Sequence, residues 1–403
     1  MNVYTQRVAK LVSSMTPKLV ALRRQIRMNP ELSRAEFQTT QLVAQELEAI
    51  GLTPRILPNK VGLTCDIGPS VADTGVPLIA LRADLDALPL EDLVRGEHRS
   101  KVAGVAHACG HDVHIAAVVG AGRVLAKLAE VDALQTGVRL IFQPAEELQP
   151  GGAVDVIAAG GLDGVGQIFA VHCEPRLDVG TIGLREGPIT SASDKITIKF
   201  TGAGGHTSRP HLTNDLVFAL GAVITQVPGI LSRKIDPRSG TNLTWGMVNS
   251  GSAPNVIPAF GELEGTLRCL DIAAWERAGD VLDEAVHAVI APFGIEAEVR
   301  HDRGVPPVVN DRHAVQLQQR ALHEVLGEAG EIPVEQSLGG EDFAWYLTRA
   351  AGAMARLGTR TPGGRTYDLH QGDFDPDERA IAIGAKFLAT TALLASAEHL
   401  EQG

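Results

Sequence analysis

The sequence predicts an α/β domain that is interrupted by a smaller α+β domain. Short, almost wholly apolar runs alternate with longer amphipathic runs before residue 187 and again after residue 303. This alternation is typical of buried strands joined by helices. Between these two parts, apolar and polar residues alternate strictly, which indicates half-exposed antiparallel strands. At 403 residues the chain also exceeds the size that one hydrophobic core usually supports.

The first part of the chain begins with an amphipathic helix over 4–28, which ends before Asn29-Pro30. Ser33 and Glu36 have the spacing of a capping box, so we expect a second helix to begin there and to end near Gly51. Three buried strands are predicted at 76–81, 138–142 and 168–171, with a helix over 115–128 between the first two. These elements predict a mixed, largely parallel sheet that is flanked by helices.

The inserted part has strands at 195–201, 241–249, 261–270 and 296–300, and helices near 215–227 and 273–290. In the first of these strands, Ile196, Ile198 and Phe200 share one face, as expected for an antiparallel sheet with one exposed side. This pattern predicts an α+β sandwich of about a hundred residues. The α/β pattern then resumes with a helix over 313–326, a strand over 353–357 and a terminal helix over 380–397. We therefore expect a first domain formed by 1–187 and 303–403, into which 188–302 is inserted.

Composition excludes several classes of function. The formal net charge is −12, whereas a nucleic-acid-binding groove needs a basic face. No uncharged apolar run approaches the ~20 residues of a membrane span. The chain has four widely spaced cysteines and no CxxC pair, which is typical of a reduced compartment. We expect a cytoplasmic protein that binds neither nucleic acid nor membrane.

Candidate metal ligands cluster at 107–114 and at the ends of predicted strands. The cluster itself places a thiol and an imidazole at the start of a helix. An acid pair and two further histidines follow predicted strands, and side chains at such positions meet at one edge of an α/β sheet. This set of sulfur, nitrogen and oxygen ligands suits two divalent ions of zinc, manganese, cobalt or nickel. The proposed ligands are Cys109, His111, Glu147, His172 and His370.

Other acids at this edge have different expected roles. Glu146 precedes the proposed ligand Glu147 and could take the proton of an activated water. Asp84 and Asp86 could orient a ligand histidine, and Asp86 is counted with the catalytic candidates. A different interpretation makes Cys109 a nucleophile with a neighbouring histidine as its base. That interpretation leaves the acid pair and the two distant histidines without a role.

The inserted domain carries its own candidates. His206 follows Gly204-Gly205, and the glycines allow a tight turn that holds the histidine clear of the sheet. Asn255 lies between two prolines, in a Pro-Asn-Val-Ile-Pro segment. Arg268 alternates with apolar neighbours on a strand, so it faces away from the core and could clamp a carboxylate.

Taken together, the motifs resemble those of the M20 metallopeptidase family. The similarity runs along nearly the whole chain and is closest to the amidohydrolase branch, which includes hippurate hydrolases, aminoacylase-like enzymes and auxin-conjugate hydrolases. It rests on Arg82-Ala-Asp-Leu-Asp-Ala-Leu-Pro89, His107-Ala-Cys-Gly-His-Asp-Val-His114, Gln143-Pro-Ala-Glu-Glu147, Gly204-Gly-His206, Pro254-Asn-Val-Ile-Pro258 and Gly340-Glu-Asp-Phe343. Three positions depart from the family's usual residues: Thr207, Leu216 and Gln371. These departures affect the expected shape of the pocket, and none of them replaces a proposed ligand.

The resemblance implies an enzyme that cleaves the amide bond of N-acyl-amino acids, or alternatively a peptidase acting on small peptides. It implies two divalent metal ions on the five ligands, with Cys109 in place of the bridging acid of the wider family and Glu146 as general base. It also implies that the inserted domain is a lid that forms a homodimer, or part of a tetramer. His206 would stabilise the oxyanion across the dimer, and Asn255, Arg268 and Gly340 would hold the substrate. A catalytically silent binding protein on this fold is the remaining alternative.

Overall fold

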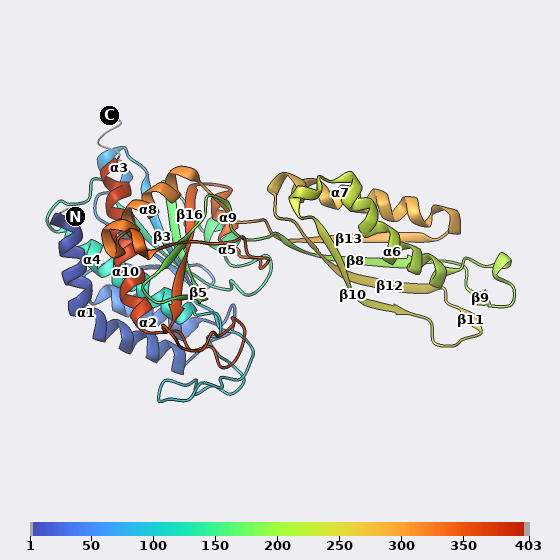
Figure 1. Cartoon of the computed structure of the whole chain (residues 1–403), viewed down its shortest axis with the longest axis horizontal. Coiled ribbons are helices and arrows are strands. Elements are labelled where there is room, and N and C mark those ends of the chain that lie inside the picture. Colours follow the sequence, from blue (N-terminus) through green and yellow to red (C-terminus); the bar gives the residue numbers. More distant parts are fainter. Residues whose placement is uncertain (1–2, 399–403) are drawn as a thin grey trace. The chain divides into compact units, whose positions relative to one another are not determined.

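The computed structural model describes residues 3–398, which form two compact units (Figure 1). Unit 1 comprises 3–189, 309–335 and 345–398, and unit 2 comprises Thr190–Val308 and Gln336–Ala344. The predicted insertion, 188–302, is therefore too short. Its last strand continues to Val305, and the side chain of Gln336 donates hydrogen bonds to backbone oxygens of Thr190 and Leu270, which joins a second segment to unit 2.

Unit 1 is built on an eight-stranded sheet in the order β1-β2-β4-β3-β5-β16-β6-β15. Its four central strands, β4, β3, β5 and β16, are mutually parallel. β2 runs antiparallel to β1 and β4, and β6 runs antiparallel to β16 but parallel to β15. The predicted mixed, largely parallel sheet is confirmed. The strands are β1 Arg55–Ile56, β2 Leu63–Ile67, β3 Leu78–Asp84, β4 Val138–Gln143, β5 Val165–Asp178, β6 Ile182–Leu184, β15 Glu331–Pro333 and β16 Ala351–Arg360, with a separate pair β7 Gly187–Pro188 and β14 Val309–Asn310.

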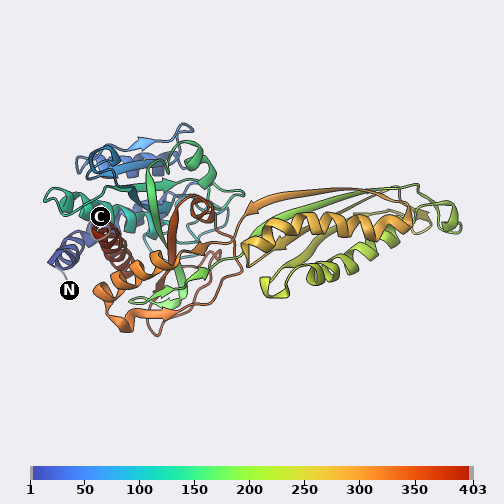
Figure 2. The same ribbon diagram turned by 90° about the horizontal axis from the view of Figure 1, so that it is seen from above.

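Helices α1, α4 and α10 pack together against this sheet (Figure 2). The most deeply enclosed is α4, whose first twelve residues are all buried, so its N-terminus is fixed in the core. The helices of unit 1 are α1 Val3–Met28, α2 Phe37–Glu48, α3 Val71–Thr74, α4 His111–Ala129, α5 Ala153–Ala158, α8 Arg312–Leu326, α9 Ala344–Leu347, which begins at the border with unit 2, and α10 Arg379–Glu398.

The predicted capping box at Ser33–Glu36 is wrong. Helix α2 begins at Phe37 with Glu36 as its N-cap, and the Glu36 side chain makes no capping bond. The Ser33 hydroxyl instead donates to Asp86 Oδ2 at 2.6 Å, and Glu36 Oε1 accepts the backbone N–H of Ala145 at 2.7 Å. Both side chains therefore point away from α2 and bond to segments that carry site residues.

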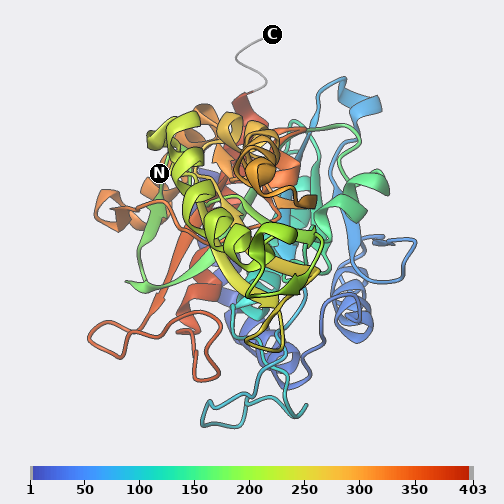
Figure 3. The ribbon, with the colours of Figure 1, turned by 90° about the vertical axis from the view of Figure 1, so that its right-hand side faces the viewer.

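Unit 2 is a four-stranded antiparallel sheet in the order β10-β12-β8-β13, with α6 and α7 side by side on one face (Figure 3). Ile196, Ile198 and Phe200 of β8 are fully buried and their neighbours are more exposed, which confirms the predicted alternation. The elements are β8 Ser193–Thr201, β9 Gly205–His206, α6 Leu216–Lys234, β10 Asn242–Ser250, β11 Val256–Ile257, β12 Phe260–Arg268, α7 Ile272–Ile290 and β13 Glu296–Val305.

Two helices, α6 and α10, are long and apolar enough to pass a test for membrane spans based on length and composition. In α10, 78% of the apolar window is buried inside the protein, where it packs against α4 and α8. The corresponding share for α6 is 39%, and its buried face packs against α7. The apolar character of α10 is thus accounted for by its place in the core of unit 1.

Candidate metal centre

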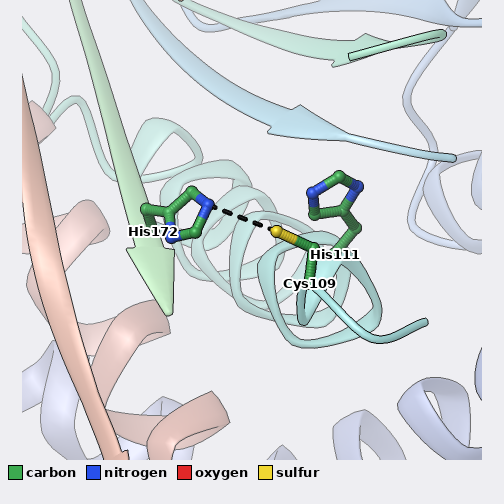
Figure 4. A group of neighbouring side chains, drawn as sticks. All are labelled: Cys109, His111 and His172. Atoms are coloured by element: carbon green, nitrogen blue, oxygen red, sulfur yellow. Dashed lines mark hydrogen bonds between the residues drawn. The ribbon is translucent and has the colours of Figure 1, made fainter. Parts of the chain in front are cut away.

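The five predicted ligands come together within unit 1. The ligand atoms of Cys109, His111 and His172 all lie within 4.8 Å of one another, and so do those of Cys109, Glu147 and His370. Figure 4 shows Cys109 between the two imidazoles of the first group, with its Sγ 3.6 Å from Nε2 of His172. Because Cys109 belongs to both groups, the arrangement has the form of two adjacent sites that share one ligand.

Two of these ligands lie elsewhere than at the expected strand ends. His172 is inside β5 and not after it, because β5 continues to Asp178 in register with β16. His370 follows β16 by ten residues and belongs to the long loop before α10. In this loop the His370 backbone N–H donates to the oxygen of Ala108, which ties the loop to the start of the Cys109 segment.

Backbone carbonyls determine which nitrogen of two histidines faces the centre. Nδ1 of His111 lies 2.8 Å from the oxygen of Asp86, and Nδ1 of His172 lies 2.8 Å from the oxygen of Cys173. A carbonyl oxygen can only accept, so in the neutral form of each ring Nδ1 carries the proton and Nε2 presents the lone pair that a metal would take. Burial lowers the pKa of His172 well below its usual value, which also favours the neutral ring that a metal needs.

The surroundings of His111 fit a bound cation. Its buried Nε2 has no hydrogen-bond partner among the described residues, yet carboxylate oxygens of Asp84, Glu146 and Glu147 lie 3.7–3.9 Å away. Burial alone would lower the pKa of His111, but the charge of Asp84, followed by the hydrogen bond and the charge of Asp86, outweighs it and raises the pKa to about 10. So many buried carboxylates around one imidazole create a negative potential that a divalent ion would neutralise.

Gly110 explains the spacing of Cys109 and His111. It has a φ of +88° and precedes the first residue of α4, so the chain turns sharply between the two ligands. A Cβ at this position would lie 2.7 Å from Sγ of Cys173. Only glycine combines this conformation with this close approach, which lets a thiol before the turn and an imidazole after it share one site.

Asp86 holds the loop that carries the acid pair. Its Oδ1 accepts the N–H of Glu146 and its Oδ2 that of Glu147, each at 3.0 Å. The side chains of Glu146 and Glu147 are 8% and 10% exposed, so both are nearly enclosed. Asp86 therefore orients both acids through their backbones while its own carbonyl oxygen orients His111.

Comparison with known proteins places the chain in one family. Residues 80–394 match the model of peptidase family M20/M25/M40. The chain belongs to this family. It is a hydrolase of the M20 type.

Three similar proteins illustrate the range of the family. N-acetyl-L-cysteine deacetylase of Bacillus subtilis is 36% identical over 94% of this chain and 89% of its own length. The YXEP protein of Bacillus subtilis, described as a dinuclear metal-binding peptidase of family M20, is 31% identical with a TM-score of 0.82 over 96% and 99% of the two chains. A Rhodococcus jostii protein that carries the name glutamate–cysteine ligase 2-3 is 47% identical over 92% of this chain. This chain spans only 46% of that longer protein, so the ligase name describes a larger molecule.

A second histidine of the M20 motif links the two strands that flank the site. His114 Nδ1 lies 2.7 Å from Asp84 Oδ1, and its Nε2 accepts the N–H of Cys173 at 2.9 Å. Because a backbone N–H can only donate, Nδ1 of His114 is the protonated nitrogen. His114 thus joins the end of β3 to the residue after His172.

The four remaining candidates lie in unit 2, in two groups. His206 pairs with Val256 between β9 and β11, next to Asn255, and both candidate side chains are exposed. Arg268 ends β12 and its Nη1 donates to the oxygen of Leu338, two residues before Gly340. Since β12 spans roughly 27 Å at ~3.4 Å per residue, the two groups are at opposite ends of the unit 2 sheet.

Sequence reasoning missed Ser33 and Glu36. Both were assigned to a helix cap, because the Ser-x-x-Glu spacing before an apolar run is the usual signal for one. The complete burial of Glu36 distinguishes a side chain that bonds to a distant turn from one that caps its own helix. This burial depends on the packing of distant segments against Glu36. A single sequence contains no local signal of that packing.

Replacing Glu36 with glutamine is expected to remove a pH-dependent loss of stability. Burial raises the pKa of Glu36 to about 7 in the folded protein, whereas an unfolded chain has a value of about 4.3. The folded state therefore binds this proton more tightly, and its stability falls as the pH rises between these two values. The full difference is about 4 kcal/mol.

Thermal unfolding of the wild type and of Glu36→Gln from about pH 5 to pH 8 measures this effect. The variant should gain stability relative to the wild type as the pH rises. Two curves that stay parallel over the whole range would show that Glu36 has an ordinary pKa.

Proposed function

We propose that this M20 hydrolase cleaves the amide bond of N-acyl-amino acids, giving a carboxylic acid and a free amino acid. The observation that carries the proposal is the shared position of Cys109 in two ligand groups, with the carboxylate of Glu146 within 3.9 Å of the His111 ligand atom. Two relatives, one named a deacetylase and one described as a dinuclear metal-binding peptidase, support amide hydrolysis. We place the enzyme in the cytoplasm, with no nucleic-acid or membrane partner, and the four buried free cysteines agree with that.

Cys109, His111, Glu147, His172 and His370 would hold two divalent ions, of zinc, manganese, cobalt or nickel. When bound, such ions polarise an amide carbonyl and increase the acidity of water. Glu146 acts as general base, taking a proton from the attacking water and delivering it to the leaving amine. Its nearly enclosed carboxylate is suited to this exchange, because little bulk water competes for the proton.

The unit 2 candidates would bind the rest of the substrate. Arg268 has a guanidinium that can clamp the carboxylate of the amino-acid part, near the backbone of Gly340. His206 and Asn255 would donate to the developing oxyanion and to the substrate, which is worth roughly 10²–10³ in rate for one such donor. Because His206 and Arg268 are at opposite ends of the unit 2 sheet, we infer that they serve different sites, and the resemblance to the family assigns His206 to the site of a second subunit.

This inference requires at least a homodimer. β10 is the edge of the unit 2 sheet, and it exposes Met247 and Val248, with Val217 and Phe218 of α6 also exposed. An uncharged edge strand with apolar side chains is suited to pair with a second copy. A tetramer would need a further surface.

Val248→Lys is expected to convert the dimer to a monomer and to remove most of the activity, because a charge on an edge strand opposes pairing. The matched control is Glu298→Lys, which adds the same side chain to an exposed position on the other edge strand, β13. Light scattering after gel filtration, combined with an activity assay, measures both effects. A wild type that is fully active as a monomer would exclude the shared site.

A peptidase that acts on small peptides is the second candidate, and the description of the YXEP protein favours it. The experiment is a panel of acetyl-, benzoyl- and longer acyl-amino acids together with di- and tripeptides, assayed for released amino acid with and without a chelator. We expect chelator-sensitive cleavage of N-acyl-amino acids. Cleavage of peptides alone would favour the peptidase. Cleavage that a chelator does not inhibit would favour a thiol amidase with Cys109 as nucleophile, and binding without cleavage would favour a catalytically silent protein.

A further inference from the structure

The turn that carries Glu146 and Glu147 is held by acids from two distant segments. Three consecutive backbone N–H groups, those of Ala145, Glu146 and Glu147, each donate to a buried carboxylate. Asp86 accepts the second and third, as described above. The first is accepted by Glu36, which precedes α2 and is 109 residues away in the sequence.

Ala145 is the residue that most needs such support. It is fully buried and has a φ of +54°, in the left-handed region that residues with a Cβ rarely adopt. Its N–H donates to Glu36 Oε1 at 2.7 Å, and its carbonyl accepts the N–H of Gly152 at 2.9 Å. A change at either bond would allow the peptide to return to a more common conformation, which would rotate the next two side chains.

No other role of the Glu36 side chain is evident within residues 3–398. Its side chain is fully buried, and Oε2 has no hydrogen-bond partner within residues 3–398. It does not cap its own helix, and no cation is paired with it in the described part of the chain. Burying a carboxyl group is costly where hydrogen bonds do not compensate for it, and the bond to Ala145 is the one that links Glu36 to the turn.

Its protonation state agrees with this arrangement. Burial is the main reason why the pKa of Glu36 is raised to about 7, and the nearby charge of Asp86 acts in the same direction. A proton on Oε2 leaves Oε1 free to accept the N–H of Ala145. A glutamine side chain can imitate this protonated form.

We propose that Glu36 is a positioning residue, which fixes the left-handed turn at Ala145 and thereby aims the carboxylates of Glu146 and Glu147. The proposal deepens the proposed function and rests on it for the roles of those two acids. The geometric part, the control of the turn by Glu36, can be tested without any assumption about the substrate.

The test compares Glu36→Met, Glu36→Asp and Glu36→Gln with the wild type. Methionine fills the same volume without an acceptor, and aspartate withdraws the acceptor by one methylene group. Glutamine keeps an oxygen at the place of Oε1. We expect kcat to fall by about 10²-fold in the methionine variant with little change in KM, because misplacement of a reacting group by about 1 Å has an effect of this size. The glutamine variant should stay within about threefold of the wild type, since it preserves the bond.

A structural readout accompanies the kinetics. Hydrogen exchange followed by mass spectrometry over 143–149 should show faster exchange in the methionine and aspartate variants, and wild-type exchange in the glutamine variant. Cobalt titrations should show the same order in metal affinity, because Glu147 moves with the turn. The matched control is Glu31→Gln, since Glu31 accepts the N–H groups of Gln38 and Thr39 at the start of α2 without contacting the turn.

Slow exchange and full kcat in Glu36→Asp would overturn the proposal, as would a glutamine variant as damaged as the methionine variant. If the methionine variant does not fold, the aspartate and glutamine variants still decide the question. If the wild type cleaves no N-acyl-amino acid, the proposed function fails, whereas the exchange and cobalt measurements still test the role of Glu36.

Discussion

Replacing Glu146 with glutamine is expected to lower kcat by about 10²–10⁴-fold, the range that a general acid–base group usually contributes. The amide has the size of the carboxylate but cannot take a proton from water. The ligand set is unchanged, so the variant should bind metal as the wild type does. Steady-state kinetics and elemental analysis of the same preparation measure the two properties together.

Asp155→Asn is a suitable control for this variant. Asp155 lies in α5, which follows the same loop, and its carboxylate pairs with Arg34 near the surface. It should therefore show nearly wild-type kinetics. Near-normal turnover of the Glu146→Gln variant would show that Glu146 is not the general base. Loss of metal from this variant would show that Glu146 is a metal ligand.

Cys109→Asp and Cys109→Ala are expected to differ strongly from each other. Sγ of Cys109 belongs to both ligand groups, so alanine removes one ligand from each site. Metal affinity should then fall by more than the roughly 10–100-fold that loss of an outer hydrogen-bond partner causes. Aspartate can still bind a divalent ion through its oxygens, so it should retain metal and part of the activity.

The two variants also show whether Cys109 is a metal ligand or a nucleophile. If Cys109 attacked the substrate, aspartate would be as inactive as alanine, because neither provides a thiolate. Cys65→Ala, in β2, is the control for removal of another buried thiol. Metal content and kcat of all three variants, measured side by side, decide between the two roles.

Much of the fold and of the ligand set follows from local patterns. The apolar runs of β3, β4 and β5 are buried along their central residues, as such runs predict. The alternation in β8 gave the correct face for each residue. Cys109 and His111 were recognisable because their spacing across a glycine is unusual, and Glu147 because it follows the buried strand β4. His172 and His370 were included as residues after strand ends, although His172 lies inside β5 and His370 lies in the loop before α10. The roles of these residues remain predictions.

Features that depend on packing between distant segments could not be predicted. Glu36 satisfies a local rule for a helix cap, yet its side chain bonds to a turn 109 residues later, because the burial that directs it there is tertiary. The extension of β5 past His172 has the same origin, since pairing with β16 continues a strand whose own sequence, His-Cys-Glu-Pro, suggests an end. The end of unit 2 was misplaced because the bonds of Gln336 join two segments that are far apart in the chain.

The central claim is that five residues of unit 1 hold two divalent ions with Cys109 between them. A crystal structure of the zinc-loaded enzyme, with anomalous data collected on both sides of the zinc edge, tests it directly. We predict two zinc peaks, one bounded by Cys109, His111 and His172 and the other by Cys109, Glu147 and His370. A single peak that leaves Cys109 without contact to metal, or peaks away from these residues, would contradict the account.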